Sequence, residues 1–227
     1  ETTAGWRPEL HNQEQAESLL KAAGFQDAPA VFTHLQRLFD SHSVNRLSKR
    51  GHERLDTLIP LLLATVSECP PKDKDHAIHR TLDLIETIAQ RSVYLALLIE
   101  HPHVLKQLVQ LCANSAWIAE QITRYPLLLD ELLDPRRLYD PLKPGELDNA
   151  LQALLAHLPA DDLEMQMDSL NQFKRANVLR VAAAELSDKF TVEVASDYLA
   201  AIADTLVKRA LSMAWDYLTN KHGQPYY

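Results

Sequence analysis

The sequence predicts an all-α fold, and three observations lead to that prediction. Only five glycines occur in 227 residues, and they are scattered, whereas sheet proteins cluster glycine at turns that need a positive φ. Residues of strong helix propensity, above all Ala, Leu, Glu, Gln, Lys and Arg, dominate instead. Apolar residues recur at spacings of three and four between clear stop signals. We therefore expect about ten or eleven mostly antiparallel helices in a multi-helix bundle.

Capping residues divide the first part of the chain. Asn12 is expected to begin a helix that stops near Gly24, and Asp27 to cap a second helix with a continuous apolar stripe. The polar stretch 41–49 connects these to a third helix, which Pro60 should kink or divide.

Prolines and serines place the next helices. A fourth helix is predicted over about 73–90 and a fifth over 93–101, with Ser92 as its cap. A sixth begins at Pro102, where the missing N–H costs nothing. Ser115 caps a seventh helix, and an eighth follows directly after Pro126.

The segment 134–141 is the strongest internal boundary, because it carries two prolines between polar residues. A helix restarts at Pro144, and two long helices follow at about 161–187 and 196–221. Only 191–194 has the local pattern of a strand, and one short strand would have nothing to pair with.

The net charge, the two cysteines and the length of the apolar runs limit which classes of partner are expected. The net charge of −8 and the pI of about 5.7 argue against nucleic acid as the main partner. Cys69 and Cys112 lack metal-like spacing and are expected to pack as small hydrophobes in a reducing cytoplasm. Apolar runs such as 59–66 are too short to span a bilayer, so no membrane partner is expected. The missing initial Met predicts a fragment of a longer protein or a processed chain.

Candidate catalytic and metal sites are weak. His76 and His79 stand three apart on one helix, but no third ligand is specified, so exposed polar histidines are the favoured interpretation. Asp161 and Asp162 begin an aspartate-rich pattern in which Met165 occupies the place of a required acid, so helix capping explains them better. We predict no catalytic residue, no cofactor-binding residue and no metal ligand here. The least favoured hypothesis is a helical metal-dependent enzyme in which those histidines and aspartates would hold the metal.

The first of the two long helices carries polar groups within an apolar face. Lys174 and Asn177 fall on the face that also holds Leu170 and Phe173, while Leu179 points to the far side. One interpretation sends the lysine to water and gives the asparagine a backbone partner. The other makes Lys174, Asn177 and Arg180 a contact with a domain absent from this chain.

The last helix is apolar on two sides. One stripe comprises Leu199, Ile202, Leu206, Ala210, Met213 and Tyr217. A second comprises Val207, Leu211, Ala214 and Leu218. A helix this widely apolar must be covered, either by the preceding long helix or by a domain beyond Tyr227.

Three sequence blocks resemble a known family. They are SVYLALL at 92–98, RYPLLLDELL at 124–133 and FKRANVLRVA at 173–182. In this order and spacing they resemble the bifunctional glutamine synthetase adenylyltransferase/adenylyl-removing enzymes. The resemblance extends from about residue 55 to residue 224.

The resemblance implies a parent with two nucleotidyltransferase domains, one removing AMP from a tyrosine of glutamine synthetase and one adding it from ATP with Mg²⁺. It also implies the PII signalling protein as a partner. These residues resemble the helices that lead into the C-terminal adenylylating domain. The Gly-Lys-Leu-Gly-Gly-type loop and the Ser-Asp-Leu-Asp motif of that domain do not occur here. No catalytic residue is carried over, and the chain alone is expected to be inactive, with no cofactor of its own.

We expect residues 1–91 to form an N-terminal linker and helical segment and residues 92–227 the helical lead-in to the catalytic domain, with one continuous helical domain as the alternative. The predicted role is non-catalytic support of the nucleotidyltransferase domain in an enzyme that regulates nitrogen assimilation. The alternative is a stand-alone helical protein-interaction module. The sequence following Tyr227 in the parent gene would discriminate between them.

Overall fold

The structure is a computed structural model that describes residues 12–159 and 162–224. Every regular element within these two ranges is helical, and eleven of the helices have seven residues or more. The predicted all-α fold is therefore confirmed. The chain separates into two compact units, Glu1–Leu133 and Asp134–Tyr227. The division falls at the start of the proline-containing segment that the sequence marks as a boundary, whereas the functional division into 1–91 and 92–227 stays a prediction.

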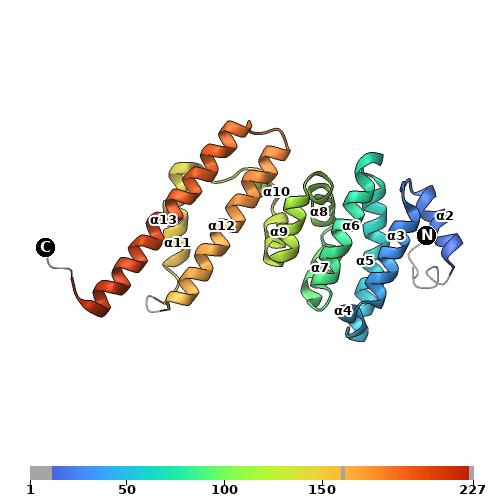
Figure 1. The fold of residues 1–227 in the computed structure, drawn as a ribbon, viewed down its shortest axis with the longest axis horizontal. Helices are drawn as coiled ribbons and strands as arrows, with labels where there is room; N and C mark the ends of the chain where they lie inside the picture. Colours follow the sequence, from blue (N-terminus) through green and yellow to red (C-terminus); the bar gives the residue numbers. More distant parts are fainter. Residues whose placement is uncertain (1–11, 160–161, 225–227) are drawn as a thin grey trace. The chain divides into compact units, whose positions relative to one another are not determined.

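The first unit is built around helix α6. Its elements are α2 (Gln13–Ala22), α3 (Ala28–Asp40), α4 (His42–Asn45), α5 (Lys49–Ser67), α6 (Pro71–Ile88), α7 (Ser92–Glu100), α8 (Pro102–Asn114), α9 (Ala116–Arg124) and the 3₁₀ helix η1 (Pro126–Leu133). Helix α6 contacts α3, α5, α8 and α9 (Figure 1). Its side chains Ile78, Leu82, Ile85 and Ile88 are completely buried, as their spacing predicts.

Several helix ends are where the capping residues place them. The side chains of Asn12, Asp27 and Ser115 accept hydrogen bonds from the backbone N–H groups of the first turns of α2, α3 and α9. Gly24 follows α2 with φ +87°. The Phe25 N–H donates to the Leu20 carbonyl, so α2 ends in a Schellman motif.

Tertiary packing overrides the local signals at three places. Helix α5 runs through Pro60 without a break, because apolar residues on both sides of the proline are buried. Ser92 is the first residue of α7, not its cap, and the N-cap Arg91 makes no side-chain capping bond. The predicted connection 41–49 contains the short helix α4, in which Val44 is buried.

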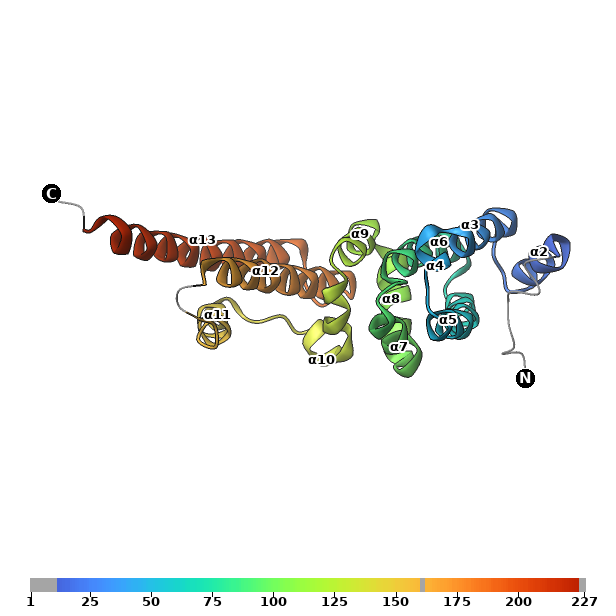
Figure 2. The ribbon, with the colours of Figure 1, turned by 90° about the horizontal axis from the view of Figure 1, so that it is seen from below.

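The second unit contains the two long helices. Its elements are α10 (Pro135–Leu138), the 3₁₀ helix η2 (Pro144–Glu146), α11 (Leu147–Leu155), α12 (Leu163–Leu186) and α13 (Val192–His222). Helices α12 and α13 pack side by side, and α11 contacts both (Figures 1 and 2). Their shared core consists of Leu147, Leu151, Leu155, Leu170, Phe173, Val181, Ala195, Ile202 and Met213.

The last helix begins earlier than predicted. Thr191 caps α13 by accepting a hydrogen bond from the Val194 N–H, so the strand-like segment is a helix start. Ala195 then packs in the core, which favours the helical conformation over the β propensity of the neighbouring valines. Within the described residues, no helix combines the length and the apolar character needed to cross a membrane.

Candidate functional site

Helix α12 places the three residues of the predicted interdomain contact in two different environments. Lys174 is exposed, whereas Asn177 and Arg180 retain only 2% and 6% of their accessible surface. A helix turns by about 100° per residue, so positions three apart drift around the helix and do not share one face fully. Of the three, Lys174 is therefore the one whose charge is directly available to a further domain.

Asn177 is only partly satisfied. Its Nδ2 donates a hydrogen bond of 2.8 Å to the Phe173 carbonyl, one turn earlier on α12. Its Oδ1 is buried and has no hydrogen-bond partner in the part of the chain that the structure describes. The first interpretation predicts a backbone partner for Asn177, and only its amide nitrogen has one. An unpaired buried acceptor destabilises a fold by about 1–3 kcal/mol. A contribution to the stability of this unit therefore does not explain why position 177 is an asparagine.

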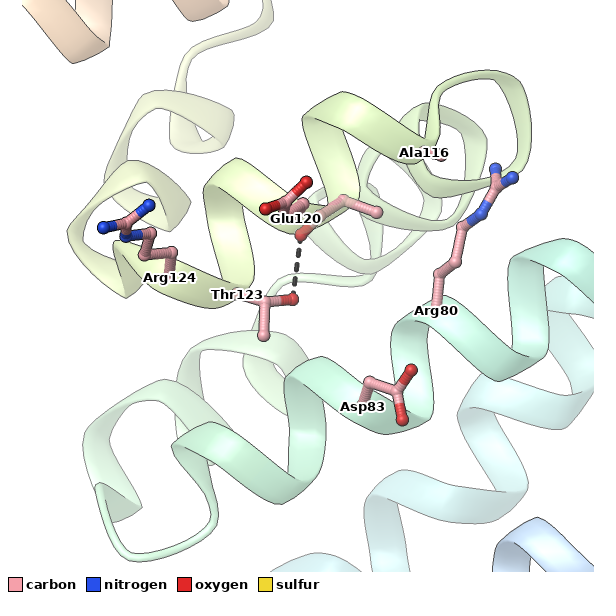
Figure 3. A pocket seen from close by; sticks show the side chains of 7 residues that line it. Arg80, Asp83, Ala116, Glu120, Thr123 and Arg124 are labelled. Atoms are coloured by element: carbon pink, nitrogen blue, oxygen red, sulfur yellow. Dashed lines mark hydrogen bonds between the residues drawn. The ribbon is translucent and has the colours of Figure 1, made fainter.

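A cleft lies between α6 and α9 of the first unit (Figure 3). It has a volume of about 350 Å³ and is lined by Arg80, Asp83, Ala116, Ala119, Glu120, Thr123 and Arg124. Arg80 Nη1 donates to the Cys112 carbonyl at 2.6 Å, and so satisfies the C-terminal end of α8. Asp83 accepts from Arg37 at 2.8 Å, and the Thr123 hydroxyl donates to the Ala119 carbonyl. Arg80 and Asp83 thus join neighbouring helices, whereas the Thr123 bond lies within α9. The lining residues include no Ser, Cys or His.

A histidine pair joins α3 to α6 beside this cleft. His34 Nδ1 lies 2.7 Å from His79 Nδ1. His34 Nε2 lies 2.7 Å from Arg37 Nη2 and 3.1 Å from Asp83 Oδ1. The Arg37 guanidinium can only donate and the Asp83 carboxylate can only accept, so these two neighbours of Nε2 favour opposite tautomers of neutral His34. The contacts therefore join His34 to both charged groups and to His79 without fixing its tautomer.

The environment of His34 favours its neutral form. Burial lowers the pKa of His34, the Arg37 charge and His79 lower it further, and Asp83 opposes them. The unfolded chain has the ordinary histidine pKa of about 6.5. Below that value the unfolded state binds the proton more readily than the folded state does, so folding becomes less favourable.

We expect the free energy of unfolding of the first unit to fall as the pH drops from 7.5 to 5.5. The variant H34Q should lose part of this pH dependence, because glutamine can still donate and accept but does not titrate. The measurement is urea unfolding at both pH values. H76Q is the matched control, since it removes an exposed imidazole from α6. An identical pH dependence in H34Q and the parent chain would show that His34 does not contribute.

The other candidate ligands are not assembled into a metal site. His76 is exposed, and His79 is partly buried against His34 and is not the exposed residue that the sequence indicates. Among the described residues, no group of three or more His, Cys, Asp or Glu side chains could hold a metal ion. Asp162 caps α12 by accepting from the Met165 N–H at 2.9 Å, as expected. Asp161 lies outside the described residues.

Both cysteines are free thiols. Burial raises the pKa of Cys112 to about 12. The pKa of Cys69 is also raised, first by burial and then by the nearby Asp73 carboxylate. The thiolate is the reactive form of cysteine, so these shifts disfavour the reactive form of both residues. The packing role predicted for Cys112 is confirmed, since its side chain is fully buried.

Comparison with known proteins decides the family. The sequence profile described as "Glutamate-ammonia ligase adenylyltransferase" matches residues 105–227, which is more than half of the chain. The chain belongs to the glutamate-ammonia ligase adenylyltransferase family. The resemblance of the three sequence blocks is thereby confirmed.

Curated relatives match almost the whole chain. Proteins of Thioalkalivibrio sulfidiphilus and Pseudomonas putida are each 42% identical to it over 93% and 97% of its length. A protein of Pseudomonas syringae is 43% identical over 97%. All three are named bifunctional glutamine synthetase adenylyltransferase/adenylyl-removing enzyme. The chain spans only 22% to 23% of the length of these relatives.

The residues that match the adenylyltransferase family, 105–227, include α9 and the whole second unit. They therefore include Lys174, Asn177 and Arg180. The histidine pair and the α6 side of the cleft lie before it. Sequence reasoning did not find the pairing of His34 with His79, because the two are 45 positions apart on different helices. No local pattern indicates such a contact, and the one available signal was the place of His34 beside the apolar stripe of α3, three residues after Val31 and four before Leu38.

Proposed function

We propose that this chain is a non-catalytic helical region of an enzyme that adenylylates and deadenylylates glutamine synthetase and thereby regulates nitrogen assimilation in the cytoplasm. Identity above 40% with enzymes of that name, over nearly the whole chain, is the observation that carries the proposal. The glycine-rich loop and aspartate motif of the family's catalytic domains do not occur in these residues. ATP and Mg²⁺ would then bind in another part of the longer polypeptide. Glutamine synthetase and PII would be partners of that polypeptide.

The proposed role is to support the adjoining nucleotidyltransferase domain. Two features of the second unit favour this supporting role over that of a stand-alone helical protein-interaction module. The Asn177 oxygen is buried without a partner in the described residues, and the charged end of Lys174 is exposed on the same helix. Lys174 suits a direct contact with a further domain, and the unpaired Asn177 oxygen is a buried polar group that packing within the described residues does not explain.

The deciding experiment is transfer of labelled AMP from ATP to glutamine synthetase in the presence of Mg²⁺. We expect the 227-residue chain to transfer none, and the polypeptide extended through the next domain to transfer AMP. Glutamine synthetase incubated without either protein gives the background. Transfer by the short chain alone would show that it contains an active site and would overturn the non-catalytic proposal.

The variant K174A tests the interdomain contact. In the extended polypeptide we expect adenylylation to fall by about threefold to tenfold, because a charged contact at an interface is lost. Stability should change by less than about 0.5 kcal/mol, since Lys174 is exposed. Q172A, at an exposed position two residues earlier on α12, is the matched control.

R180A tests the same contact, but its effect on activity is harder to separate from its effect on stability. We expect it to lower adenylylation more than it lowers stability, but Arg180 is buried, so some loss of stability must accompany the loss of activity. Thermal unfolding of each variant separates the two effects. Full adenylylation activity in both K174A and R180A would refute the assignment of these residues.

A further inference from the structure

The second apolar stripe of α13 lies on the surface of the second unit. We define the outer stripe as Val207, Leu211, Ala214 and Leu218. Val207 and Leu211 expose 67% and 68% of their accessible surface, and Leu218 exposes 52%. Trp215 is next to the stripe and exposes 48%. Large apolar residues are exposed singly on most proteins, so a row of them along about three turns indicates a contact surface.

The core of the unit cannot account for this row. Ile202 and Met213, from the first stripe, are buried in the core between α11, α12 and α13. At about 100° per residue, Leu211 and Leu218 point to nearly the opposite side of the helix from these two. The core therefore covers the middle of the first stripe, whereas Leu199 and Tyr217 at its two ends stay exposed, as does the whole second stripe.

The outer stripe has the composition of a helix-packing face. Its members follow at intervals of four, three and four, the spacing at which side chains of one helix form a ridge. Ala214 and the exposed Ala203 at the margin allow a close approach of another backbone. Charged residues, Asp204 and Lys208, border it and remain in solvent. This pattern fits a partner that presents its own apolar face and is polar beside it.

We propose that the outer stripe packs against an apolar face of the rest of the longer polypeptide, namely the adjoining nucleotidyltransferase domain, and this proposal rests on the proposed function. The relatives that match these residues are more than four times as long as the chain. A domain in the same polypeptide is present at an effective concentration of the order of millimolar.

The size of the stripe favours a tethered partner over a second copy of the chain. A stable interface between separate proteins uses about 20 residues on each side. The outer stripe and Trp215 supply only five. A small contact of this kind is sufficient within one polypeptide, where the translational freedom of the partner is already restricted.

Thiol labelling tests the proposal. In a C69S background, L211C places a thiol in the outer stripe and S212C places one on the next, exposed position of the same helix. Cys112 is buried and unreactive. The alkylation rate by a maleimide is measured in the 227-residue chain and in the polypeptide extended to the length of the relatives. Circular dichroism of each variant establishes that it is folded.

We expect L211C to react rapidly in the short chain and at least about tenfold more slowly in the extended polypeptide, because a covered thiol is inaccessible. The rate of S212C should change much less. Equal rates of L211C in the two proteins would overturn the proposal. Slow, concentration-dependent labelling already in the short chain, together with dimers in analytical ultracentrifugation, would also overturn it, because a second copy would then cover the stripe.

The AMP-transfer assay separates this proposal from the proposed function. If L211C is protected in an extended polypeptide that transfers no AMP to glutamine synthetase, the docking surface stands and the proposed function fails. If the extended polypeptide is active and L211C is labelled as fast as in the short chain, the proposed function stands and the docking surface fails.

Discussion

Replacing Ile85 by alanine should lower the free energy of unfolding of the first unit by about 2–5 kcal/mol. Ile85 is completely buried in α6, the helix that α3, α5, α8 and α9 all contact. The substitution removes three carbon atoms from a site with neighbours on several sides, so the surrounding helices cannot collapse fully into the cavity. A loss of this size is a large part of the 5–15 kcal/mol that stabilises a typical protein.

The change can be measured by urea unfolding with tryptophan fluorescence. In a W6F/W215F background the remaining tryptophan, Trp117, lies on α9 and reports on the first unit. V93A is the matched control, because Val93 exposes 75% of its surface on α7 and should change stability by less than about 0.5 kcal/mol. If I85A lost no more stability than V93A, α6 would not be the centre of this unit.

The burial of Ile85 could be predicted from sequence because the signal is local. Ile78, Leu82 and Ile85 recur with the period of a helix, and no other fold explains that spacing as simply. The same holds for the ends marked by Asp27 and Ser115, since a capping side chain acts on N–H groups only two or three positions away.

Other features depend on residues that are distant in sequence. Whether Pro60 interrupts its helix depends on how much apolar surface is buried on either side, and the helix is not divided. Residues 126–133 were expected to be an α-helix, and they form a 3₁₀ helix that buries Leu128, Leu129 and Leu132. Periodicity does not separate these two helix types over so short a segment.

The candidate site shows the same limit. The helical pattern places Lys174 and Asn177 near one another, but it does not say what lies opposite each of them. The structure leaves Lys174 exposed and buries Asn177 and Arg180, so three polar residues that look equivalent in sequence differ in their access to a partner. The contact of His34 with His79 could not be predicted at all, because the two residues lie on different helices, 45 positions apart.

Replacing Phe173 by alanine should destabilise the second unit by about 3–5 kcal/mol. Phe173 is the only aromatic residue among the nine buried residues of the described core in which α11, α12 and α13 meet. Its ring is the largest side chain of this core, so its truncation leaves the largest cavity. The Asn177 amide also bonds to the Phe173 carbonyl, so a shift of this turn of α12 would disturb a second, already unsatisfied, buried residue.

Trp215, on α13, reports on this unit in a W6F/W117F background. L163A is the control, because Leu163 begins α12, the helix that carries Phe173, but exposes 39% of its surface. F173A should shift the urea midpoint of the Trp215 signal to much lower urea, while L163A changes it little. Equal midpoints would mean that the core around Phe173 does not hold α12 against α13.

The same substitution links stability to the proposed docking surface. The outer stripe keeps its direction only while Ile202 and Met213 of the first stripe are held in the core, so loss of the Phe173 ring should misplace Leu211 and Leu218 together. In the extended polypeptide, F173A should therefore reduce adenylylation in proportion to the folded fraction of the second unit. An osmolyte that restores folding should restore the activity, because osmolytes favour the compact state without replacing any contact. Activity that stayed low in refolded F173A would instead assign Phe173 a direct part in the contact with the neighbouring domain.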